Sequence, residues 1–211
     1  MVSENEKNAK HDVFGGDAGQ LNKSLLADPA SLGLAAFGFT TFLLSFVNVG
    51  ILSSSSVGIV MALAFAYGGF GQLITGAFEM RRGNTFGFTA FVSYGSFWFF
   101  YGFLILFASL NIIALPAKAL GIALILWGLF TLYMWLNAIR LNLSLNLVFL
   151  FLWLAFIFLG FGSYYGSTPL TRIGGILGFL TAFFAAYTSF AIVSNSIKEK
   201  SMPLGPALFK K

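Results

Sequence analysis

The amino-acid sequence predicts an all-α integral membrane protein with six transmembrane helices. Of its 211 residues, 58% are hydrophobic and only 9% are charged, whereas a soluble domain carries about 25% charged residues. The charges fall between long apolar runs, and a helix needs about 20 apolar residues to cross a bilayer. We therefore expect one transmembrane domain, residues 29–197, between an N-terminal tail, 1–28, and a C-terminal tail, 198–211.

Charged residues, prolines and serines set the predicted helix boundaries. Residues 29–78 carry no charge, and at about 1.5 Å per residue this run is too long for one span, so the four serines at 53–56 divide it. Asp28 followed by Pro29 predicts the start of the first helix, because an acidic cap and a proline in the first turn are typical of helix starts. The predicted helices are 32–52, 57–79, 86–108, 118–139, 143–161 and 171–195.

The distribution of Lys and Arg predicts the orientation. Loops rich in these residues remain in the cytoplasm. With the N-terminus inside, every Lys and Arg except Lys118 and Arg172 lies on the cytoplasmic side. We therefore expect a multi-pass protein of the cell membrane with both termini in the cytoplasm. The N-terminal tail holds most of the acidic residues and is predicted to be solvated and disordered.

Several function classes are excluded by composition. The chain has no cysteine, so it can form neither disulfides nor thiolate metal sites. Its net charge of +5 does not predict nucleic-acid binding, because the basic residues form no stripe along one helix. The only histidine, His11, lies in the N-terminal tail, away from any acidic partner in the spans. We expect no enzyme activity, no metal and no cofactor.

The two halves of the chain share short patterns. Residues 32–35 and 120–123 both read Leu-Gly-aliphatic-Ala, and residues 89–91 and 181–183 both read Thr-Ala-Phe. Both pairs are spaced by about 90 residues, and a three-helix repeat must insert its second copy upside down. The patterns predict two inverted three-helix repeats around a central path. The alternative is a chance likeness between helices rich in Phe, Gly and Leu.

Polar side chains inside the apolar runs mark candidate positions along such a path, because they are costly in hydrocarbon. Gln72 places a primary amide at mid-membrane depth, and Thr41, Ser45 and Asn48 share one face of the first helix. Amides and hydroxyls can donate hydrogen bonds to a carboxylate. The alternative for each Ser or Thr is a hydrogen bond that joins helices.

Glu79 is the only acid between residues 28 and 199. It precedes Arg81 and Arg82 at the predicted end of the second helix, so we expect an interfacial ion pair there. Ion-coupled carriers usually keep an ionisable residue near the middle of the membrane, and this sequence has none. A passive channel, or passage of the substrate together with a proton, fits better than a proton relay.

Four sequence blocks resemble the acetate uptake transporter family, which includes the succinate–acetate permeases. The blocks keep their order and are residues 28–41, 67–87, 89–98 and 127–132. The family signature begins with Asn and has a second Pro, where this chain has Asp28 and Ser31.

This resemblance implies a function, an assembly and a site. It implies a channel or permease for acetate and other small monocarboxylates, with succinate in some members, and a homohexamer with one pore in each protomer. It implies a pore constriction formed by Phe37, Tyr94 and Leu152. Polar contacts to the substrate are then expected from Thr40, Gln72, Thr131 and Asn48.

Two other functions stay open from the sequence. One is a pore for a small neutral solute such as urea or ammonia. The other is a membrane sensor that transports nothing, although the short tails offer no large domain for signalling.

Overall fold

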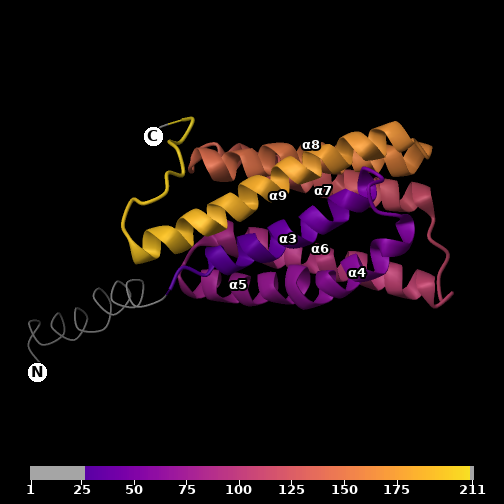
Figure 1. Ribbon diagram of the computed structural model, residues 1–211, viewed down its shortest axis with the longest axis horizontal. Helices are drawn as coiled ribbons and strands as arrows, with labels where there is room; N and C mark the ends of the chain where they lie inside the picture. The colour runs from indigo at the N-terminus through magenta and orange to yellow at the C-terminus, as the bar shows by residue number, and fades with distance from the viewer. Residues whose placement is uncertain (1–26, 210–211) are drawn as a thin grey trace, which may run out of the picture.

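The computed structural model describes residues 27–209. Predictions that concern residues 1–26 and 210–211, the disordered N-terminal tail and His11 among them, lie outside the described residues. Within 27–209 the chain is helical and has six helices long and apolar enough to cross a membrane, which confirms the predicted fold class (Figure 1).

The six spans begin and end within a few residues of the predicted positions. The first span, α3, ends at Asn48 instead of residue 52, because Gly50 adopts a left-handed conformation that a helix cannot continue. The fifth span, α8, runs on to Tyr165 before Gly166 ends it in the same conformation. The elements are α3 (Ala30–Asn48), η1 (Ser54–Ser56), α4 (Val57–Leu63), η2 (Ala64–Gly69), α5 (Phe70–Arg81), α6 (Thr85–Ser109), α7 (Ala117–Ala138), α8 (Leu143–Tyr165) and α9 (Thr168–Ile197).

The spans alternate in direction, so the chain enters and leaves the bundle at the same end. We call this the basic end, because it carries Arg81, Arg82, Arg140, Lys198 and Lys200. Figure 1 shows α7, α8 and α9 grouped along one side, with α3, α4, α5 and α6 along the other. Alternation places the second group of three spans upside down relative to the first, as an inverted repeat requires. The repeat itself stays a prediction.

The three helices that start at the basic end are each preceded by an Asp or Asn that caps them. Asp28 Oδ1 accepts a hydrogen bond from Ala30 N at 3.0 Å. Asn84 accepts from Gly87 N at 3.1 Å, before α6, and Asn142 accepts from Leu145 N at 2.9 Å, before α8. These side chains satisfy backbone donors that a helix start leaves free.

The second span contains a π-helical turn, η2, which the sequence reading did not predict. A Cβ atom added at Gly68 would lie 2.9 Å from Thr40, and one at Gly69 would lie 2.7 Å from Phe99. The two glycines therefore let α3 and α6 approach the wide turn closely. Such turns in otherwise regular helices are frequent at functional sites.

The residues after α9 pack against the bundle. We call residues 198–209 the C-terminal strap. Asn195 holds it by accepting from Met202 N and donating to Met202 O, both at 2.9 Å. Tyr187 donates to Pro203 O at 2.6 Å, and Ser144 N donates to Leu204 O at 3.0 Å. The strap therefore crosses the basic end beside the start of α8.

Candidate functional site

Two cavities follow one another inside the bundle. The basic-end cavity has a volume of about 530 Å³, and its wall includes Asp28, Arg82 and Leu204. The far cavity has a volume of about 280 Å³. Its wall includes Asn48, the last residue of α3, and Thr171, in the first turn of α9, so it lies toward the end of the bundle opposite the basic end. Phe37 and Leu152 belong to the walls of both cavities. These two side chains therefore stand where the cavities meet.

The three residues of the predicted constriction come together from α3, α6 and α8. The rings of Phe37 and Tyr94 pack with centroids 5.7 Å apart. Tyr94, Phe37 and Leu152 share the wall of the basic-end cavity, and all three are buried. All three residues therefore line the same cavity. That they form its narrowest part stays a prediction.

Tyr94 is held by an aromatic group and one hydrogen bond. Its hydroxyl donates to Thr131 Oγ1 at 3.0 Å, and the Thr131 hydroxyl donates to Trp127 O at 2.7 Å. The rings of Trp127, Phe130 and Phe149 surround the Tyr94 ring. Thr131 lines neither cavity, so in this geometry it orients Tyr94 and does not face the space itself.

The other predicted polar contacts lie in different places. Gln72 is 1% exposed, forms part of the basic-end wall, and has an Oε1 atom without a hydrogen-bond partner. Asn48 lies in the wall of the far cavity. Thr40 lines neither cavity, because its hydroxyl donates to Ala36 O at 2.7 Å and its side chain packs against Gly68.

Trp98 places a polar group in the far cavity that the sequence did not indicate. Its side chain is 2% exposed, lines the far cavity, and has an indole N–H without a hydrogen-bond partner. A buried N–H normally has a partner, so this donor is available to a ligand. The sequence gives no signal for it, because one aromatic residue in a Phe-rich helix has no predicted direction.

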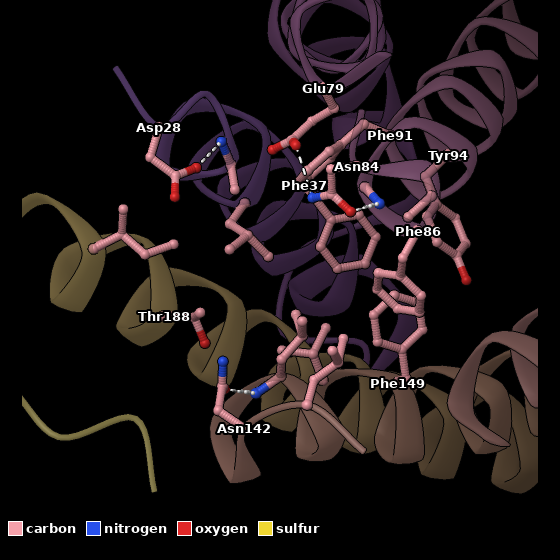
Figure 2. Close-up of a pocket in the computed structure, with 18 of the residues that line it drawn as sticks. Asp28, Phe37, Glu79, Asn84, Phe86, Phe91, Tyr94, Asn142, Phe149 and Thr188 are labelled. Carbon is pink, nitrogen blue, oxygen red and sulfur yellow. Dashed lines mark hydrogen bonds between the residues drawn. The ribbon is translucent and has the colours of Figure 1, made fainter. Parts of the chain in front are cut away.

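The charged residues of the basic-end cavity are arranged differently from the predicted ion pair. Arg82 Nη1 lies 2.8 Å from Asp28 Oδ1 but 4.0 Å from Glu79 Oε1. Arg81 lies over the Phe78 ring, at 5.7 Å from its centroid. Figure 2 shows Asn84 hydrogen-bonded to Glu79, with Asp28 on one side of this pair and the rings of Phe86, Tyr94 and Phe149 on the other. Glu79 therefore forms the expected pair with Arg82 only at the longer distance, and its side chain is buried in the cavity wall.

Comparisons with known proteins identify similar sequences and a similar solved structure. The model of the GPR1/FUN34/yaaH family matches residues 14–204. The succinate-acetate/proton symporter SatP of Escherichia coli (strain K12) is 38% identical over 176 residues, which are 83% of this chain and 93% of that protein. Acetate permease A of Emericella nidulans is 39% identical over 213 residues, covering 91% of this chain and 72% of that protein. The structure of the bacterial acetate channel SatP matches with a TM-score of 0.82 at 37% identity, covering 85% of this chain and 99% of that one.

Proposed function

This chain belongs to the GPR1/FUN34/yaaH family, and we propose that it is a channel or permease for acetate and other small monocarboxylates. The observation that carries the proposal is the pair of cavities that meet at Phe37 and Leu152. Together with the names of the relatives, this arrangement supports a path for a small carboxylate through a single chain. A transport role also leaves no need for catalytic residues, and we propose that the protein is not an enzyme.

The walls of the two cavities suit a small carboxylate. Gln72, Asn48 and Trp98 carry neutral donor groups, which can replace part of the water that the substrate loses. The helices α3, α6 and α8 start at the basic end, where the positive ends of their dipoles favour an anion. Neutral donors bind an anion weakly enough for it to dissociate again, as conduction requires.

We assign the constriction to Phe37, Tyr94 and Leu152, and direct substrate contacts to Gln72 and Asn48. Bulky apolar side chains from three helices exclude hydrated ions, because the ring cannot replace their water. Thr40 and Thr131 support the cavity walls without contacting the substrate, since their hydroxyls donate to backbone carbonyl groups.

We further propose that the basic end and both tails face the cytoplasm of a cell membrane. The five basic residues of the basic end, against Lys118 and Arg172 at the other end, support this orientation. The native chain has no cysteine, so labelling of single cysteines tests it. A reagent confined to the outside should modify a cysteine at Ser54 or Ser167 and miss one at Asn84. Labelling at Asn84 from outside would reverse the assignment.

The family resemblance also supports a homohexamer with one path in each protomer. Many large apolar side chains on the bundle surface are exposed in the single chain, Phe39, Phe70 and Phe183 among them, and lipid or neighbouring protomers can cover them. Light scattering on the purified protein should give the mass of six chains. The mass of a single chain would contradict this assembly.

Uptake by proteoliposomes tests the proposed substrate. Labelled acetate should enter vesicles that contain the protein faster than protein-free vesicles, whereas labelled urea should enter both at the same rate. Protein-dependent urea uptake without acetate uptake would favour a pore for neutral solutes. Uptake of neither would favour a sensor.

A further inference from the structure

Glu79 is a fully buried acid in the wall of the basic-end cavity. Its side chain is 0% exposed. Asn84 Nδ2 donates to Glu79 Oε2 at 2.7 Å, which fixes the plane of the carboxyl group. The other oxygen, Oε1, has no hydrogen-bond partner. Because Oε2 is already an acceptor, Oε1 is the atom that can hold a proton and donate it.

The charges around Glu79 do not neutralise it. Asp28, Glu79 and Arg82 are the charged residues that line this cavity among residues 27–209. Arg82 pairs with Asp28 at 2.8 Å and approaches Glu79 only to 4.0 Å. On the other sides, α6 presents Gly87 to the Glu79 carboxyl group, and the wall residues of α8 and α9 are uncharged. The three groups therefore sum to −1 when Glu79 is ionised and to zero when it is protonated.

The two protonation states of Glu79 have opposite effects on a carboxylate substrate. An ionised Glu79 repels a carboxylate in the cavity, because like charges at short range and low dielectric interact strongly. A protonated Glu79 leaves the cavity neutral and offers one O–H donor. An acid and a carboxylate can then share one proton, as two carboxyl groups close together do in other proteins.

We propose that Glu79 is a substrate-binding residue, which holds a monocarboxylate by sharing one proton with it. This inference rests on the proposed function. Solvent supplies the proton, which forms an O–H bond with Glu79 Oε1, and the substrate carboxylate accepts the hydrogen bond. If the proton moves to the substrate, the O–H bond at Glu79 breaks, one forms on the substrate, and a neutral acid lies beside an ionised Glu79. Whether Glu79 or the substrate holds the proton, the binding of one carboxylate takes up one proton from the solvent.

The test is the pH dependence of acetate affinity, measured from the concentration dependence of labelled acetate exchange in proteoliposomes. Between about pH 7 and pH 8, above the ordinary range of carboxylic acids, the wild type should lose affinity by up to about tenfold, because one proton is linked to binding. Glu79→Gln keeps the acceptor for Asn84 and mimics the protonated acid. Its affinity should be the same at both pH values and higher than that of the wild type at about pH 8.

Asp28→Asn is the matched control, because it removes one negative charge from the same cavity without removing the buried acid. It should change acetate affinity at both pH values and keep the pH dependence of the wild type. The proposal is wrong if Glu79→Gln keeps that pH dependence, or if it assembles normally but no longer exchanges acetate.

Two further readouts separate the possible failures. If Glu79→Gln does not assemble, a pH dye can count the protons that the purified wild type takes up on binding acetate. One proton per acetate supports the proposal, and none overturns it. If the wild type shows no protein-dependent acetate exchange, the proposed function itself fails.

Discussion

Among single residues, the side chains where the two cavities meet matter most for transport. Phe37 and Leu152 line both cavities, and the Tyr94 ring packs on Phe37. Of these three side chains only that of Tyr94 carries a polar atom, and its hydroxyl donates a hydrogen bond to Thr131. A passing solute therefore meets apolar surface at this point, so size and dehydration should limit what crosses.

The first prediction concerns the size of this opening. Phe37→Ala should raise acetate flux by roughly three- to tenfold, because a barrier reduced by about 1 kcal/mol has that effect, and it should admit larger acids such as butyrate. Phe39→Ala is the matched control, since Phe39 lies two residues away and is exposed on the outside of the bundle. Unchanged size selectivity in a folded Phe37→Ala protein would refute the constriction. Flux of labelled acids into proteoliposomes gives the measurement.

The second prediction concerns Gln72. A hydrogen bond to a charged group contributes about 1.5–3 kcal/mol, so Gln72→Leu should weaken acetate binding by roughly ten- to a hundredfold. Size-exclusion chromatography should show an unchanged assembly. If the assembly dissociates, Gln72 joins helices and is not a substrate contact, and the assignment would have to be withdrawn.

At the scale of elements, the C-terminal strap covers part of the basic end. Asn195→Ala removes two hydrogen bonds to Met202, each worth about 1 kcal/mol. A cysteine at Leu204 should then react with a maleimide about tenfold faster or more. Ser196→Ala is the control, because the Ser196 hydroxyl bonds only to Val193 O in its own helix. Equal labelling rates in the two variants would mean that Asn195 does not hold the strap.

The spans could be predicted well from the sequence, because each is a long apolar run and charges, serines or prolines separate one run from the next. It missed η2, since a π-helical turn depends on contacts with α3 and α6 that no local pattern reveals. It also missed the strap, whose hydrogen bonds join residues 187 and 195 to 202 and 203 across a turn.

The same limit applied to the candidate site. Motif resemblance identified Phe37, Tyr94 and Gln72, which share one cavity wall. It could not show that Thr40 and Thr131 point to backbone carbonyl groups, because helix direction alone does not fix a side-chain partner. The two arginines after Glu79 predicted an ion pair, which Arg82 forms at 4.0 Å, but they could not show that packing against Gly87 buries the carboxyl group.

Across the whole molecule, the two cavities that follow one another through the bundle differ in character. The basic-end cavity contains charged residues and the Gln72 amide, whereas the far cavity contains neutral hydroxyl, amide and indole groups. The apolar side chains of Phe37 and Leu152 stand between the two cavities. We propose that acetate crosses the membrane past these side chains.

Modification of a cysteine between the two cavities is the most direct test of this path, because the native chain contains no cysteine. Leu152→Cys should carry acetate into proteoliposomes until a small thiol reagent modifies it, after which most of the flux should stop. Phe39→Cys, on the exposed outer side of α3, should keep its flux after modification. Unchanged acetate flux through Leu152→Cys, with modification confirmed by mass spectrometry, would contradict the path.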